Sequence, residues 1–126
     1  MKNYDKEKKE KMGFCITLKA VNLFYDETKK SFSEISKIET SIEKFLRNLE
    51  KSMHEVIWYI GIDFINDKIC ERFMFSKSGF MEIYLMPQEL NIYVTSKEKM
   101  NKLYNALKKT LIKLKKTYLI KEIKIK

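Results

Sequence analysis

A chain of 126 residues, 44% of them apolar and 13% aromatic, has the size of one globular domain and does not have the composition of a disordered protein. No apolar run reaches the roughly 18 residues of a membrane span, and the charged N-terminus lacks the apolar segment of a secretory signal. The net charge of +9 favours an acidic partner. We therefore predict a cytoplasmic protein with a flexible charged arm at 1–11 and a single domain at 12–126.

The first predicted elements are a strand and a long helix. Alternate residues are apolar from Phe14 through Ile16 and Leu18 to Ala20, which predicts a strand with one buried face. The alternation fails near 21–24, which indicates a β-bulge or the end of the strand. A helix is predicted over about 32–55, where Ser31 and Glu34 have capping-box spacing. Its apolar stripe consists of Ile35, Ile38, Ile42, Leu46, Leu49 and Met53.

The central part of the chain predicts an antiparallel meander. Short β-rich segments occupy 56–64, 68–76, 80–86 and 90–95. The segments between them have turn chemistry, and they are Asn66-Asp67, Lys77-Ser78-Gly79 and Pro87-Gln88-Glu89. Connections this short join only antiparallel neighbours. We therefore expect these strands to pair in sequence order.

The last part of the chain completes the expected fold. A second helix is predicted over about 97–117, with Ser96 as its N-cap. Residues 118–126 are predicted to be an edge strand, and a continuation of the helix is the alternative. The order is then β-α-β-β-β-β-α-β. Two amphipathic helices beside a meander predict an α+β fold, a two-layer sandwich with both helices on one face of the antiparallel sheet.

Signatures of enzymes are weak in this sequence. The single histidine, His54, follows Glu50 by four residues, and we expect it to be solvated and paired with that carboxylate. Three acidic residues of the strand region, Asp63, Glu71 and Glu82, are expected to line a solvated rim or to pair with Arg72. Their convergence on an acid–base site is the alternative. Neither a metal site nor a cofactor is predicted, since further ligands and a glycine-rich phosphate loop are missing.

The positive charge is concentrated near the C-terminus. Residues 97–126 contain 11 lysines and 2 glutamates, a balance of +9 that equals the charge of the whole chain. On a helical wheel the lysines opposite the apolar stripe are Lys102, Lys109, Lys113 and Lys116, and those bordering it are Lys97, Lys108 and Lys115. This ridge predicts docking on a polyanion. A solvated face from an AT-rich genome, for example of a virus or mobile element, is the other interpretation, because 68 residues have AT-rich codons.

Nucleic acid is one candidate polyanion. Arg47 and Arg72 are the only arginines, so we expect weakly specific contact with the DNA or RNA backbone rather than reading of bases. Tyr59, Tyr84 and Tyr93 could share a sheet face with Arg72 and stack single-stranded bases. The favoured interpretation is that these tyrosines fill edges of the core with their hydroxyls reaching water.

A protein is the other candidate partner. Both faces of the segment 56–65 are apolar, with Trp58, Ile60, Ile62 and Phe64 assigned to one face and Ile57, Tyr59 and Ile65 to the other. Such a strand needs a second cover, which its own helices, a partner or a homodimer through the sheet would supply. The leading hypothesis is a non-enzymatic binding or regulatory protein (an inhibitor, immunity-type protein or adaptor) that docks an acidic macromolecule. The alternatives are a nucleic-acid-binding protein and an enzyme of unrecognised type.

Overall fold

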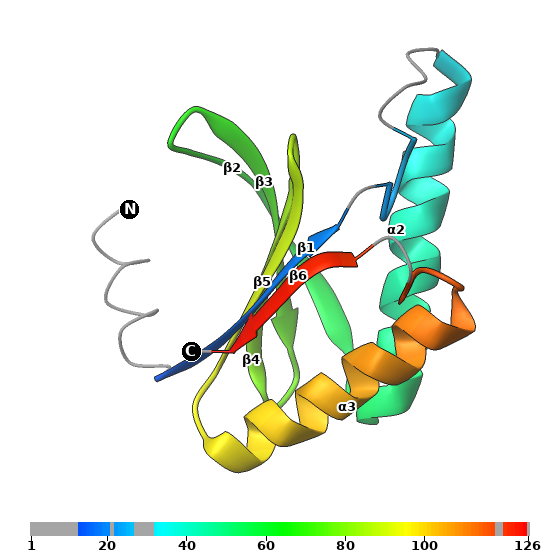
Figure 1. The fold of residues 1–126 in the computed structure, drawn as a ribbon. Coiled ribbons are helices and arrows are strands. Elements are labelled where there is room, and N and C mark those ends of the chain that lie inside the picture. Colours follow the sequence, from blue (N-terminus) through cyan, green and yellow to red (C-terminus); the bar gives the residue numbers. More distant parts are fainter. Residues whose placement is uncertain (1–12, 21, 27–31, 118–119, 126) are drawn as a thin grey trace.

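The fold is described from a computed structural model for residues 13–20, 22–26, 32–117 and 120–125. The charged arm at 1–11 lies outside these residues. A six-stranded antiparallel sheet is covered on one face by two helices (Figure 1). The strands are β1 (Phe14–Ala20), β2 (Ile57–Ile65), β3 (Lys68–Phe75), β4 (Gly79–Leu85), β5 (Gln88–Val94) and β6 (Ile120–Ile125); the helices are α2 (Phe32–Met53) and α3 (Lys97–Lys113).

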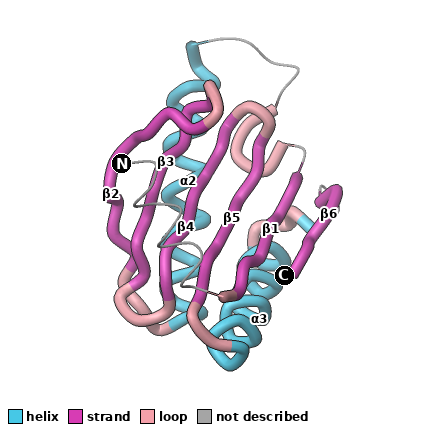
Figure 2. Tube along the Cα trace, turned by 90° about the vertical axis from the view of Figure 1, so that its left-hand side faces the viewer, coloured by secondary structure: helices cyan, strands magenta, loops and turns pink. Residues whose placement is uncertain are grey.

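The predicted α+β fold and its element order are confirmed. The sheet order is β2-β3-β4-β5-β1-β6, so the meander from β2 to β5 pairs in sequence order and β1 joins it beside β5 (Figure 2). Gly79 allows the close approach of β4 and β5, because a Cβ at this position would lie 1.8 Å from the carbonyl oxygen of Tyr93. β1 ends at Ala20, and its pairing with β6 shifts register between Lys19 and Ala20.

The predicted extent of the second helix was wrong. α3 begins at the predicted N-cap, where the Ser96 side chain accepts a hydrogen bond from the backbone N–H of Lys99, but it ends at Lys113. Lys115 has a left-handed φ of 56°, which ends a helix, and the N–H of Lys116 donates to the carbonyl of Leu111 at 2.9 Å. The chain then returns as β6, an edge strand beside β1, which confirms the predicted edge strand over Ile120–Ile125.

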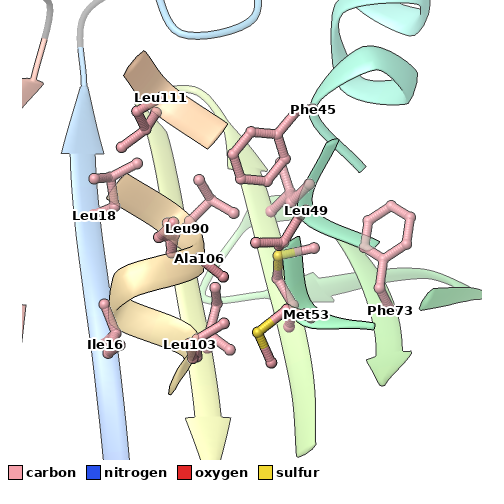
Figure 3. Packing of buried hydrophobic residues seen from close by; sticks show 14 of the residues in the cluster. Ile16, Leu18, Phe45, Leu49, Met53, Phe73, Leu90, Leu103, Ala106 and Leu111 are labelled. Carbon is pink, nitrogen blue, oxygen red and sulfur yellow. The ribbon is translucent and has the colours of Figure 1, made fainter. Parts of the chain in front are cut away.

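The core lies between the sheet and the helices (Figure 3). Its residues include Ile16 and Leu18 of β1, and both α2 and α3 contribute the apolar stripes expected from their periodicity. Fully buried helix residues include Leu49 and Met53 of α2 and Leu103 and Leu111 of α3. Phe45 lies outside the predicted stripe, yet its side chain is 1% exposed and its ring packs edge-on against Phe24.

Candidate functional site

Exposed apolar side chains gather on the hairpin formed by β2 and β3. Among the residues that the structure describes, seven of the ten exposed large apolar side chains lie between positions 56 and 69. They are Val56, Trp58, Tyr59, Ile60, Ile62, Phe64 and Ile69, here called the hairpin patch. Ile62 and Phe64 are 61% and 65% exposed. β2 is an edge strand, and the exposed fractions of its side chains mean that the cover predicted for its two apolar faces is incomplete within the described chain.

A β-bulge divides the side chains of β2 differently from the predicted alternation. The pairing of β2 with β3 shifts register between Tyr59 and Gly61, and Gly61 has a φ of 145° that favours glycine. Before the bulge, Tyr59 lies opposite Phe73 of the core, and after it Ile62 and Phe64 take that side. The assignment of Trp58, Ile60, Ile62 and Phe64 to one face was therefore wrong, because one extra residue exchanges the faces.

An open groove of about 640 Å³ runs beside the hairpin patch, between α2 and strands β2 and β3. Its apolar lining includes Ile42, Leu46, Val56, Ile57, Tyr59 and Phe73. Its charged residues are Glu39, Glu43, Arg47, Glu50 and Glu71. This volume falls within the range of ligand sites. We call this feature the α2 groove.

The α2 groove is acidic although the chain as a whole is basic. Arg47 pairs with Glu43 at 3.0 Å, so its positive charge is shared with a carboxylate of the same helix. Burial raises the pKa of the Glu71 carboxyl, and the nearby Glu39 carboxylate raises it further. A cation placed between these two carboxylates would relieve their repulsion.

The sheet face opposite the helices holds a row of polar side chains. Arg72 lies 3.9 Å from Asp63, and it stands directly across the strands from Glu82. The Tyr93 hydroxyl donates to Glu82 at 3.2 Å, and burial together with that carboxylate raises the pKa of Tyr93. The pKa of Tyr84 is raised for the same two reasons.

The structure places on opposite faces of the sheet several residues that the sequence predicted to lie together. Glu71 lies on the helix side of the sheet, whereas Asp63 and Glu82 lie on the other, so the alternative of an acid–base site from all three was wrong. Tyr59 likewise faces the helix side, away from Arg72. The reason is the pleat, since neighbouring positions point to opposite faces and the bulge changes the parity of β2. Tyr84 is buried and Tyr93 half-buried, and the Tyr93 hydroxyl donates to the buried Glu82 carboxylate rather than reaching water as expected.

The lysines of the predicted ridge lie in several environments. Lys102 pairs with the buried carboxylate of Glu55 at 3.7 Å, and Lys108 lies over the Tyr104 ring. Lys116 lies beyond the end of α3, where its ammonium group donates to the carbonyl of Asn22 at 3.4 Å. A continuous column from Lys102 to Lys116 was therefore wrong, because the helix ends first. The exposed lysines that remain are Lys97, Lys109, Lys113 and Lys115.

Two further residues, His54 and Glu55, have environments that the sequence did not predict. His54 is exposed at the end of α2 with a left-handed φ of 55°. The Glu50 carboxylate expected to pair with it accepts a hydrogen bond from the Ile57 backbone N–H at 2.9 Å. The buried position of Glu55 was not predicted, because its partners, the Lys77 and Ser78 backbone N–H groups, are more than twenty residues away in sequence.

Comparisons with known proteins leave the chain without a family. No protein-family model and no curated protein matches it. One similar solved structure is the crystal structure of the adenosylmethionine decarboxylase from Aquifex aeolicus VF5, with a TM-score of 0.47 and 14% identity over 90% of this chain and 83% of that chain. A likeness of this degree carries no argument about activity.

Two features are absent from the residues that the structure describes. Neither helix there is long and apolar enough to cross a membrane. The same part of the chain holds no cluster of three or more histidine, cysteine or acidic side chains arranged to bind a metal ion.

Proposed function

We propose that this chain is a non-enzymatic binding protein that docks another protein through the hairpin patch, in the manner of an inhibitor, immunity-type protein or adaptor. The observation that carries the proposal is the gathering of exposed apolar side chains on one hairpin, while the rest of the described chain exposes only three. By their register, Tyr59, Ile62, Phe64 and Ile69 take the helix side of the hairpin, whereas Trp58 takes the other side. Single exposed apolar residues are ordinary on protein surfaces, but several neighbouring ones on one side mark interaction sites. Aromatic side chains such as Tyr59 and Phe64, which share the helix side, are also enriched at the centres of interfaces.

Site-specific cross-linking tests this proposal. A benzophenone photo-cross-linker introduced at Phe64 should attach to one specific protein in cells of the source organism. The matched control is a cross-linker at Met86, which is 78% exposed in the turn after β4 and lies outside the patch. The same products from both positions, or none from Phe64, would contradict the proposed role of the hairpin patch.

A second copy of the chain is one protein that could occupy the patch. A homodimer through the β2 edge would bury the exposed apolar side chains against their own copies. Sedimentation tests this directly: if a second copy is the occupant, the mass should double at micromolar concentration and return to that of one chain in an Ile62→Ser/Phe64→Ser variant. A mass of one chain for the unaltered protein would rule the homodimer out.

The basic helix supports a second candidate function, the docking of an acidic protein surface or a nucleic-acid backbone. Lys109 and Lys113 are exposed one turn apart on α3 and flank Ile112, which is 63% exposed. Lysines so placed attract phosphate or carboxylate groups.

The Lys109→Glu/Lys113→Glu variant tests that second candidate. If the partner is nucleic acid, the unaltered chain should retain mixed-sequence DNA or RNA near about 50 mM salt and lose it by about 200 mM. The charge reversal should abolish this retention, whereas the same reversal at Lys44 and Lys51, exposed on α2, should leave most of it. Equal losses would indicate a dependence on net charge alone, and no retention at low salt would remove nucleic acid as a partner.

A further inference from the structure

Among the described residues, no strand pairs with the outer edge of β2, and this edge retains backbone hydrogen-bonding groups over a short stretch. In antiparallel pairing, alternate residues direct their backbone groups toward and away from the neighbouring strand. Val56 pairs inward, since its carbonyl accepts from the Ser76 N–H at 2.9 Å, so Ile57 and Tyr59 point outward. The outward N–H of Ile57 is occupied by Glu50, and that of Phe64 donates to the Asp63 side chain at 2.8 Å. Between Ile57 and Phe64, the alternation directs the backbone N–H and C=O groups of Tyr59 and Ile62 away from β3, where an added strand could bond to them.

The α2 groove lies beside this same stretch. Tyr59 belongs both to the open edge and to the lining of the groove, and α2 forms the opposite wall. A strand added to such an edge would direct every second side chain to the helix side of the sheet, over the groove. Main-chain bonds to an edge strand and side chains in an adjoining groove are a recurring mode of peptide recognition.

The chemistry of the α2 groove indicates which side chains of a partner it would bind. Its apolar lining suits an aliphatic stem, and its carboxylates suit a cationic head group, a combination that lysine and arginine provide. Arg47 is paired with Glu43 and Glu50 bonds to the backbone of Ile57, which leaves Glu39 and Glu71 to meet an incoming charge. A local acidic site on a chain of net charge +9 also makes the other parts of the surface poor competitors for a basic segment.

We propose that the α2 groove receives lysine or arginine side chains of an extended segment of another protein, paired with β2 at Tyr59 and Ile62. This assignment rests on the proposed docking at the hairpin patch and adds the chemistry of the partner. The segment has basic residues at alternate positions, because only every second side chain points into the groove.

Selection from a phage-displayed library of random twelve-residue peptides on the immobilised full chain tests the proposal. Enriched peptides should carry lysine or arginine at alternate positions. Emission of the single tryptophan, Trp58, on the same strand provides a readout of the affinity of a synthesised peptide. We expect a Glu39→Gln/Glu71→Gln variant to weaken this binding at least tenfold. An Asp67→Asn/Glu98→Gln variant also removes two exposed or half-exposed charges, but outside the groove, and should change binding less than twofold.

The outcomes separate this inference from the proposed function. Enriched peptides without a basic bias, or equal losses in the two double variants, would overturn the basic-segment assignment while leaving docking at the hairpin patch in place. No enrichment at all would also overturn it. A cross-linking failure at Phe64 would remove the docking function itself. A chain whose mass rises with concentration, and falls in the Glu39→Gln/Glu71→Gln variant, would replace another protein with a second copy as the occupant. Circular dichroism and the single Glu39→Gln variant check that any loss is not due to misfolding.

Discussion

The Phe45→Ala variant is expected to lose about 3–5 kcal/mol of unfolding free energy, the usual cost of truncating a buried aromatic ring to alanine. Phe45 is 1% exposed in the middle of α2, and its ring contacts Phe24 edge-on with centroids 5.6 Å apart. The substitution removes buried apolar area and leaves a cavity that neighbouring residues fill only in part. A loss of this size is a large fraction of the stability of an ordinary domain.

Phe64→Ala is the matched control for this prediction. The same substitution is made, but the Phe64 side chain is 65% exposed on β2, so the loss should stay within about 1 kcal/mol. Urea unfolding followed by circular dichroism gives both values. Equal losses in the two variants would contradict the burial of Phe45 beneath α2. Retained stability in Phe64→Ala would also allow this position to be used in binding experiments without loss of the fold.

The Glu55→Ala variant is expected to lose about 2–4 kcal/mol, because buried donors left without acceptors are costly. The Glu55 carboxylate accepts from the backbone N–H groups of Lys77 and Ser78 at 2.8 and 2.9 Å, and from the Ser78 hydroxyl. Its side chain is fully buried, and Lys102 of α3 lies 3.7 Å away. This one residue therefore joins the end of α2, the turn between β3 and β4, and α3.

The pH dependence of this effect follows from the pKa of Glu55. Burial by itself would raise that pKa, but the hydrogen bonds from Ser78 and Lys77 and the charge of Lys102 hold it below the ordinary value of 4.5. A carboxyl group whose pKa is lowered by folding stabilises the protein above its unfolded pKa, and this stabilisation is lost as the pH falls through the folded pKa. Unfolding free energy should therefore decline below about pH 4.5.

Glu55→Gln isolates that charge. The glutamine oxygen can still accept from both backbone N–H groups, and its amide can donate to the Ser78 hydroxyl, so most of the stability at neutral pH should remain. The decline of stability below pH 4.5 should be shallower in this variant than in the unaltered chain. Parallel declines in the two proteins would contradict a role for the Glu55 carboxylate. Glu43→Gln, which breaks an exposed ion pair, serves as a control with an expected loss below about 1 kcal/mol.

Local periodicity in the sequence was enough to predict most of the fold. The alternation from Phe14 to Ala20 and the apolar stripes of the two helices are set by residues a few positions apart. The structure buries most of the described ones, while Phe14, Ile38 and Leu46 are half-buried. Short turns also determined the antiparallel meander, because two to four residues cannot cross over to a parallel neighbour. The charge of the last thirty residues is likewise a property of the sequence itself.

The candidate sites were harder to predict because they depend on register and on distant neighbours. The bulge beside Gly61 moves Ile62 and Phe64 to the helix side, and no local pattern in an apolar run announces one extra residue. The end of α3 at Lys113 was likewise missed, since neither glycine nor proline follows to stop a lysine-rich helix. That early end removes Lys116 from the basic ridge and places it against Asn22.

By itself, the sequence determined the elements, their order and their apolar faces, since the periods of helix and strand are local properties of the chain. Tertiary structure alone decided which charges meet. It placed Glu55 beneath Lys102 and set Glu39 of α2 near Glu71 of β3 beside an exposed edge. The physical reason is that these contacts join segments many residues apart, and packing of the helices on the twisted sheet fixes the distances between them.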